Sequence, residues 1–266
     1  MSVYTELSEA FNDGGLRAVL SSGQAVVFHQ LAIMSKDGDW ILLEDKDSLR
    51  HVLSVLGRRQ ARYRFGAPLD LRWMRGGWSS HFEFRTASIR VRTDFVTRPP
   101  RLTPTALADL WEAQQGEPFP VIGVRDLCEV KKTNREKDYA VIGELARLLD
   151  NPSAEMLYSR SARDLTRLAE QHPDLIGKLS SERPILAKIA EGIEALESAM
   201  DAERRRLIHA NEDRLGIYVG AAAGWREAWP RVVAETEGLP LEKAHALIVS
   251  RAEEILPFAP AGEVTP

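Results

Sequence analysis

The sequence of 266 residues predicts an α+β fold, in which a mixed β-sheet with flanking helices is followed by an all-helical C-terminal region. Extended runs alternate with helical patterns in the N-terminal half, until the prolines at 99, 100 and 104 end the extended runs. Beyond them, apolar residues recur at helical spacing. We therefore expect a domain over residues 1–120 that contains the sheet and a helical domain over residues 121–266.

The elements of the N-terminal half are short and separated by turn residues. A helix is expected at 24–34, after a Ser-Ser-Gly turn, and another at 48–56, where leucines and a valine recur at helical spacing. The extended runs, which are apolar or alternate between apolar and polar residues, are at 16–21, 38–43, 69–74, 81–85 and 88–96.

The C-terminal half predicts helices at 124–132, 135–149, 159–170 and 241–256. Pro184 suits the first turn of a further long helix, because apolar residues from Ile185 to Met200 form one stripe along it.

Positive charge is concentrated in one segment of the chain. Residues 50–101 contain 12 arginines, no lysine and three acids, a balance of +9, whereas the whole chain carries −4. The chain as a whole is therefore not a general polyanion binder. The segment indicates either a local field that attracts anionic substrates or a solvated sheet face with ion pairs.

Two aspartates one residue apart, Asp37 and Asp39, lead into the extended run at 38–43. Side chains at positions i and i+2 of a strand point to the same face, so the two carboxylates lie side by side. A hard divalent cation such as Mg²⁺ relieves their repulsion and prefers oxygen ligands.

A third aspartate, Asp94, shares one face of the run at 88–96 with Arg90 and Arg92. If this strand neighbours that of Asp37, three carboxylates come together, enough to hold two metal ions. The alternative is that Asp94 neutralises the two arginines on a solvated face.

Ser22 and Gly23 lie in the turn between the first strand and the first helix. Small residues there let the backbone approach a phosphate group, and a helix start offers unbonded N–H groups. Such turns are common between strands and helices, so this one indicates a site only together with other features.

The order of these features resembles that of the nucleotidyltransferase superfamily that includes DNA polymerase β, in particular its small bacterial members of the AbiEii and minimal-nucleotidyltransferase type. In that order a small-residue turn and a helix precede the strand with two aspartates, and the strand with the single aspartate follows. Residues 127–139 (LCEVKKTNREKDY) also resemble a segment L-x-x-x-K-K-T-x-R-x-K-D that follows the catalytic sheet in many such proteins. The resemblance covers residues 14–150 and implies a nucleotidyltransferase-like sheet in the N-terminal domain.

The resemblance implies an enzyme that transfers a nucleoside monophosphate from an NTP to an acceptor hydroxyl, with a two-ion Mg²⁺ site. The acceptor would be RNA such as tRNA, a protein side chain or a small molecule, and a toxin–antitoxin context is one setting. The implied roles are metal binding and catalysis for Asp37, Asp39 and Asp94, nucleotide binding for Ser22, Gly23 and Lys131 or Lys132, acceptor steering for Arg90 and Arg92, and support of the site for Asp138.

Two other hypotheses stay open. In one, the same fold has lost turnover and uses its arginine-rich sheet to bind RNA or a protein partner. In the other, the chain is a helical assembly domain, and the helix at 184–210 forms the seam of a homodimer. Trp73 and Trp78, on either side of Arg75, fit either stacking on a nucleobase or packing in a core.

Composition argues against several other classes of protein. The single cysteine, Cys128, excludes an internal disulfide and a cysteine-based zinc site, and the six histidines lack the spacing of zinc hydrolases. No apolar run approaches the roughly 18 residues of a membrane span, and the N-terminus lacks the features of a secretory signal. We expect a cytoplasmic protein with no membrane partner.

Overall fold

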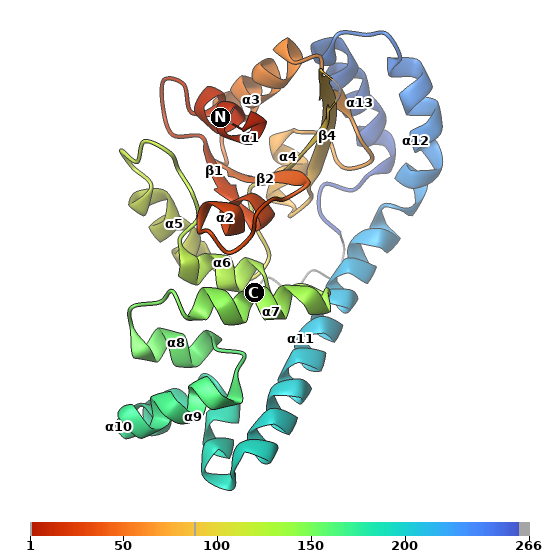
Figure 1. The fold of residues 1–266 in the computed structure, drawn as a ribbon. Helices are drawn as coiled ribbons and strands as arrows, with labels where there is room; N and C mark the ends of the chain where they lie inside the picture. The colour runs from red at the N-terminus through yellow and green to blue at the C-terminus, as the bar shows by residue number, and fades with distance from the viewer. Residues whose placement is uncertain (1, 88, 261–266) are drawn as a thin grey trace. The chain divides into compact units, whose positions relative to one another are not determined.

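The computed structural model describes residues 2–87 and 89–260 and confirms the predicted α+β class (Figure 1). The chain divides into two compact units. The first combines Met1–Ile122 with Leu215–Pro266, and the second is Gly123–Arg214. The C-terminal helices therefore belong to the unit that contains the sheet, whereas the sequence places all residues after 120 in one helical domain.

The first unit is built on a five-stranded sheet, counted over the described residues. Its order is β1-β2-β5-β4-β3; β5 pairs parallel with β2, and the other neighbours are antiparallel. Ser88, the first residue of the expected run at 88–96, lies outside the described residues. The strands are β1 (Ala18–Ser21), β2 (Asp37–Leu42), β3 (Arg62–Tyr63), β4 (Ser80–Thr86) and β5 (Ile89–Val96).

Local hydrogen bonds and backbone conformation explain where helices of the first unit begin and end. The side chain of Asp45 accepts hydrogen bonds from the N–H groups of Asp47 and Ser48 and so starts α3. α2 ends at Phe28, earlier than expected, and Gln30 soon after it has a positive φ of 61°. The helices are α1 (Val3–Phe11), α2 (Ser22–Phe28), α3 (Lys46–Arg58), α4 (Leu71–Arg75), α5 (Pro104–Ala113), the end of α11 (Ile193–Ala221), α12 (Ala223–Thr236) and α13 (Leu241–Ile255).

The extended run expected at 69–74 is wrong, because these residues form α4 instead. The side chain of Asp70 accepts from the N–H of Arg72 and caps the helix, and Gly77 follows its end with a φ of 75°. Trp73 and Met74 are both buried, as one side of a helix requires. The N-cap at Asp70 and the glycine after the helix end therefore favour a helix more than the short alternation of apolar residues favours a strand.

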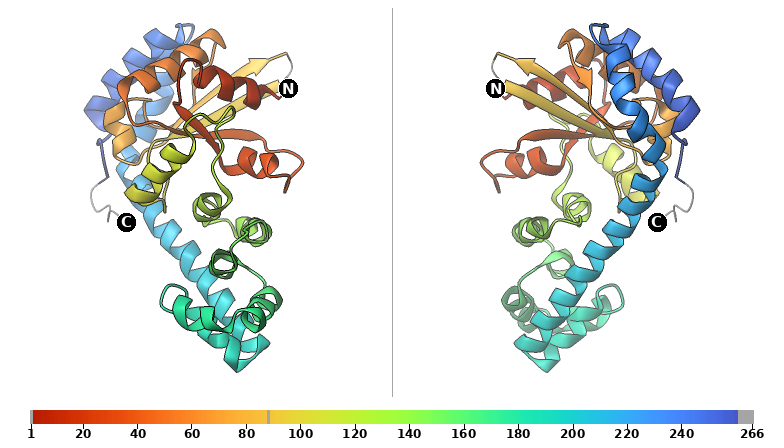
Figure 2. Two further views of the ribbon diagram at one scale, coloured as in Figure 1. Left: turned by 90° about the vertical axis from the view of Figure 1, so that its left-hand side faces the viewer. Right: turned by 90° about the vertical axis from the view of Figure 1, so that its right-hand side faces the viewer.

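The sheet has one apolar and one polar face, as the alternation of β5 predicts. Val91, Thr93 and Phe95 are buried on one face, and the charged residues between them lie on the other. α1 covers the apolar face, with α3 beside it (Figure 2). The ring of Phe11 meets those of Trp40 and Phe95 edge-on, at 5.2 and 5.6 Å between ring centroids.

Trp73 and Trp78 lie in a core cluster, with exposed fractions of 0% and 6%. Trp73 Nε1 donates to the carbonyl oxygen of Leu256 at 3.1 Å, and Trp78 packs edge-on against Tyr218 at 4.9 Å. Trp225 of α12 belongs to the same cluster. The two tryptophans therefore pack α4 and its following turn against the C-terminal helices and do not form an exposed stacking platform.

The second unit is helical throughout its described elements. The single helix expected from Pro184 is wrong, because Gly192, with a φ of 101°, separates a 3₁₀ helix from α11. Although α11 is the longest helix, none in the described part of the chain is long and apolar enough to cross a membrane. The elements are α6 (Val124–Val130), α7 (Glu136–Ala146), α8 (Pro152–Tyr158), α9 (Ala162–Gln171), α10 (Pro173–Leu179), η1 (Pro184–Glu191) and the first part of α11.

A buried carboxylate, Glu203 of α11, organises the second unit. It pairs with the guanidinium groups of Arg160, which is largely buried, and Arg183, which is buried. Arg183 also donates to the carbonyl oxygens of Met156 and Ser159, at 2.6 and 2.9 Å. Burial acts to raise the pKa of Glu203, but its hydrogen bonds and charge pairing with the two arginines outweigh burial and lower the pKa.

We expect Glu203→Gln to lower the free energy of unfolding by about 3–5 kcal/mol, because one buried and one largely buried guanidinium group would lose their counter-charge. Glu197→Gln, at an exposed position of the same helix, is the control and should change it by less than about 0.5 kcal/mol. Urea unfolding measures both variants.

The wild type and the Glu203→Gln variant also test how the contribution of Glu203 to stability depends on pH. A carboxyl with a lowered folded-state pKa stabilises the fold above its unfolded pKa, and this stability is lost as the pH falls through the folded pKa. The stability difference between the wild type and Glu203→Gln should therefore shrink on acidification. A variant as stable as the wild type at neutral pH would contradict this role of Glu203.

Candidate functional site

The turn between β1 and α2 is held in a constrained conformation. Ser22 adopts a left-handed φ of 50°, which costs a non-glycine residue about 1–3 kcal/mol. Gly23 has no room for a side chain, because a Cβ there would lie 2.3 Å from the Oγ of Ser35. Gln24 donates to the carbonyl oxygen of Ser35 at 3.0 Å. The segment that leads into β2 thus packs directly on the turn.

Asp37 and Asp39 lie at the start of β2, beside this turn. The antiparallel pairing of β1 and β2 puts Ser21 opposite Asp39, so Ser22 and Gly23 follow at the level of the two carboxylates. Both aspartates are half-buried, and their side chains leave the strand on the same face.

Gly38, between the two aspartates, lies where the apolar side of the strand is crowded. A Cβ there would come within 2.4 Å of the Trp40 ring and 2.6 Å of the Tyr4 ring. The Tyr4 hydroxyl donates to the carbonyl oxygen of Lys36 at 2.7 Å. Burial, and then the negative charge of Asp37, raises the pKa of Tyr4. Tyr4 therefore supports the start of β2 from behind the carboxylates.

β5 places Asp94 next to Asp39. The parallel pairing aligns Asp39 with Asp94 and Asp37 with Arg92. Since residues aligned across neighbouring strands share a face, the three carboxylates lie on the polar face of two adjacent strands. The sheet therefore brings together the three aspartates that the sequence singles out.

Basic groups lie beside the carboxylates of Asp94 and Asp37. Oδ1 of Asp94 accepts a hydrogen bond from Arg64 at 3.1 Å and lies 2.7 Å from Nδ1 of His81. Oδ1 of Asp37 is 3.8 Å from the guanidinium of Arg92 and is buried, with no hydrogen-bond partner among the described residues. Within residues 2–87 and 89–260, no three His, Cys, Asp or Glu side chains stand close enough together to hold a metal ion.

The chemistry of the carboxylates on this face suits a hard divalent cation, although their present spacing does not form a closed metal site. Carboxylate oxygens are ligands that Mg²⁺ prefers, and leaving a buried polar atom such as Oδ1 of Asp37 unpaired costs about 1–3 kcal/mol, which a cation would offset. Oδ2 of Asp94 has no hydrogen-bond partner in the described part of the chain. Oxygens of two aspartates on adjacent strands are thus left for a ligand.

The polar face becomes positively charged towards the end where β4 turns into β5. Glu83 is buried and shared by the guanidinium groups of Arg62 and Arg90. Arg85 lies directly opposite Arg90 in the antiparallel pair, where like charges repel. Three arginines against one carboxylate leave an excess of positive charge on this part of the face.

Lys131, Lys132 and Asp138 belong to the second unit and form contacts there. The buried carboxylate of Asp138 accepts from Nε of Arg135 at 2.9 Å and lies 3.7 Å from Nζ of Lys131. Lys132 donates to Glu129 at 2.6 Å. Asp138 thus holds the junction between α6 and α7.

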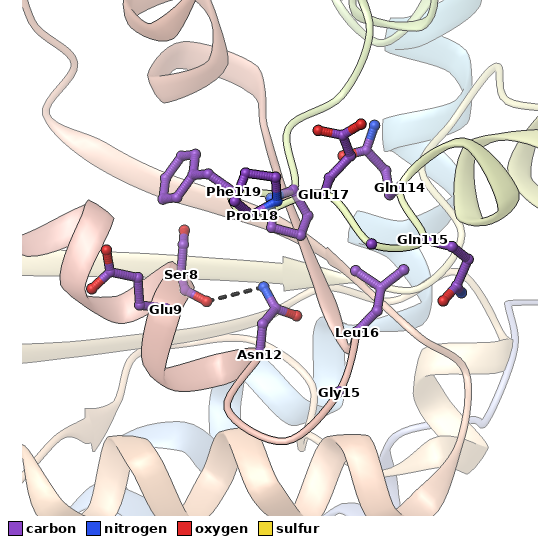
Figure 3. Close-up of a pocket in the computed structure, with 12 residues that line it drawn as sticks. Ser8, Glu9, Asn12, Gly15, Leu16, Gln114, Gln115, Glu117, Pro118 and Phe119 are labelled. Atoms are coloured by element: carbon purple, nitrogen blue, oxygen red, sulfur yellow. Dashed lines mark hydrogen bonds between the residues drawn. The ribbon is translucent and has the colours of Figure 1, made fainter.

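A hollow of about 450 Å³ lies elsewhere in the first unit, between α1 and residues 114–120 (Figure 3). Two of the polar side chains that line it are already bonded to backbone. Asn12 donates to the carbonyl oxygen of Ser8 at 3.0 Å, and Gln114 accepts from the N–H of Val121 at 2.9 Å. None of the residues singled out in the sequence lines this hollow.

Three residues of the site, Tyr4, Arg64 and His81, receive no site role from the sequence. The sequence could have placed His81 near the site, because the alternation of β4 puts it and Glu83 on the polar face. Tyr4 and Arg64 lie outside the predicted elements, and only the tertiary fold brings them to the aspartates.

Comparison with known proteins gives one structural similarity. No protein-family model matches the chain, and no curated protein matches it. A solved structure described as a "putative nucleotidyltransferase from H. pylori" is 13% identical, with a TM-score of 0.40 over 80% of this chain and 98% of that chain. A similarity of this extent does not establish a shared activity.

We expect Gly38→Ala to lower the free energy of unfolding by about 1–3 kcal/mol, because the added methyl group would meet the rings of Tyr4 and Trp40. Gly57→Ala in α3 is the control, since a Cβ at Gly57 would lie 4.0 Å from its nearest neighbour, Cβ of Leu241. Alanine favours a helix, so this change should raise the stability by up to about 1 kcal/mol. Equal effects of the two substitutions in urea unfolding would rule out the close contact at Gly38.

Proposed function

We propose that this protein is a Mg²⁺-dependent nucleotidyltransferase that transfers a nucleoside monophosphate from an NTP to an acceptor hydroxyl. The observation that carries the proposal is the register of β2 and β5, which aligns Asp39 with Asp94 and leaves Asp37 on the same face. The constrained turn at Ser22 and Gly23 lies beside the same end of β2. This arrangement is the one that the resemblance to the nucleotidyltransferase superfamily implies.

In this proposal, Asp37, Asp39 and Asp94 would hold two Mg²⁺ ions on the polar face. Bound Mg²⁺ would neutralise the triphosphate and steady the leaving pyrophosphate. Asp94 also helps to remove the proton of the acceptor hydroxyl, and Oδ2 is the oxygen for this step because no side chain of the described residues engages it.

The triphosphate is held by the turn and by a lysine. The backbone of Ser22 and Gly23 contacts the β- and γ-phosphates, and Gly23 supports this role because its missing side chain keeps the turn compact. Lys131 or Lys132 neutralises phosphate charge, and Asp138 supports that segment.

The acceptor is a hydroxyl on RNA such as tRNA, on a protein side chain or on a small molecule. Arg90 and Arg92 precede Asp94 on the polar face of β5, and Arg85 adds further positive charge. Such a field would concentrate an anionic acceptor near the carboxylates. We place the reaction in the cytoplasm, and a toxin–antitoxin pair is one setting for it.

A second candidate function is binding without turnover. The observation that favours it is that Arg64 and His81 already engage Asp94, so that the third carboxylate is matched by basic groups. Such a module would bind RNA or a protein partner through its arginine-rich face. NTP binding without transfer would support this candidate.

We expect wild-type protein to bind at least one of the four NTPs in the presence of Mg²⁺, measured by calorimetry. The Asp37→Ala/Asp39→Ala variant should lose saturable binding, because the metal–triphosphate complex would lose two carboxylate ligands. A labelled-NTP transfer screen against cellular RNA and protein then separates the two candidate functions. If the wild type binds none of the four NTPs, the enzyme proposal is wrong.

We expect Arg85→Ala to lower kcat/KM for a polyanionic acceptor about 10-fold at low salt, because the field that attracts the acceptor weakens. The effect should fade with added salt and leave kcat unchanged. Arg205→Ala, an exposed arginine of the second unit, is the control. A salt-independent effect, or the same effect in the control, would show that Arg85 does not steer the acceptor.

A further inference from the structure

His81 lies on β4 directly opposite Asp94 of β5, and the two side chains meet on the polar face. Nδ1 of His81 is 2.7 Å from Oδ1 of Asp94. Because an ionised carboxylate only accepts hydrogen bonds, the proton of this contact resides on Nδ1. The contact therefore fixes which ring nitrogen of His81 carries the hydrogen.

The other ring nitrogen of His81 is held by Ser79. Oγ of Ser79 lies 2.8 Å from Nε2, and in a neutral ring with its hydrogen on Nδ1 this nitrogen accepts from the serine hydroxyl. Ser79, His81 and Asp94 thus form one hydrogen-bonded chain along the polar face. A ring bonded through both nitrogens cannot rotate without losing one of the two contacts.

The flank of the His81 ring rests on Gly66. A Cβ at Gly66 would lie 2.5 Å from Cδ2 of His81 and 3.1 Å from the carbonyl oxygen of Ser79. The Gly66 backbone is itself fixed, because its carbonyl oxygen accepts from Nε1 of Trp225 at 2.9 Å. Packing and hydrogen bonding therefore hold the ring in one position.

Both contacts to Asp94 end on the same oxygen. Arg64 and His81 engage Oδ1, and no hydrogen-bond partner of Oδ2 occurs among the described residues. A carboxylate held by one oxygen has a fixed plane, so its second oxygen points in a fixed direction.

We propose that His81 is the positioning residue of the candidate site, which orients Asp94 so that Oδ2 serves the metal ion and the acceptor. The role of Oδ2 rests on the proposed function. His81 acts through Asp94 and contacts neither the NTP nor the acceptor. Groups that hydrogen-bond to a metal-ligating carboxylate affect metal affinity in other proteins.

The test uses Mn²⁺ alone as the probe, with its binding followed by electron paramagnetic resonance. We expect His81→Leu, which removes the donor, to weaken Mn²⁺ binding about 10- to 100-fold. His81→Asn keeps an amide donor near the position of Nδ1 and should stay within a few-fold of the wild type. Gly66→Ala pushes the ring aside and should resemble His81→Leu, whereas Gly57→Ala should bind like the wild type.

A second readout needs neither metal nor activity. Nitrogen NMR of the wild-type imidazoles should show the Nδ1–H tautomer for His81, and Asp94→Ala should abolish this preference. If His81→Leu fails to fold, His81→Asn and Gly66→Ala carry the comparison, with circular dichroism as the check on folding.

The outcomes separate this role from the proposed function. Wild-type Mn²⁺ binding that is unchanged in both His81→Leu and Gly66→Ala would overturn the positioning role and leave the metal site standing. An Nε2–H tautomer in the wild type would also overturn it. Absence of Mn²⁺ binding by the wild type would overturn the metal site and the positioning role together.

Discussion

The parallel pairing of β2 with β5 is the constraint on which the rest of the first unit depends. A slip of one residue in this register would turn Asp94 towards the aromatic core and Phe95 towards solvent. The rings of Phe11 and Trp40 prevent the slip, because both pack against Phe95 from the apolar side. The aromatic packing on one face of the sheet thus sets the positions of the carboxylates on the other.

Close contacts support the polar face from the segments around it. Gly23, Gly38 and Gly66 each lie where a side chain would collide with a neighbour, and those neighbours are Ser35, the rings of Tyr4 and Trp40, and His81. Each glycine therefore lets another group press against the backbone near the aspartates. Charged side chains held on such a tightly packed base lose less conformational entropy when they bind a ligand.

Part of this arrangement can be predicted from the sequence. Period-two alternation identifies the polar face of β5, and the Asp-x-Asp spacing puts Asp37 and Asp39 on one face. The same criterion fails at residues 69–74, where the cap at Asp70 favours a helix, and the apolar stripe after Pro184 does not reveal the break at Gly192. The contact of His81 with Asp94 and the approach of Tyr4 depend on the strand order and on α1, which local patterns do not encode. The roles in metal, nucleotide and acceptor binding stay predictions.

The division of the first unit into two stretches of sequence has a consequence for synthesis of the protein. Residues after 214 supply Tyr218, Trp225 and Leu256 to the cluster that buries Trp73 and Trp78. A chain emerging from the ribosome therefore exposes these two tryptophans until the second unit and the C-terminal helices that follow it have been translated. The helical unit is contiguous in sequence and can fold first, so the sheet unit is the last to complete its core and the one that stays open to chaperones and proteases during translation.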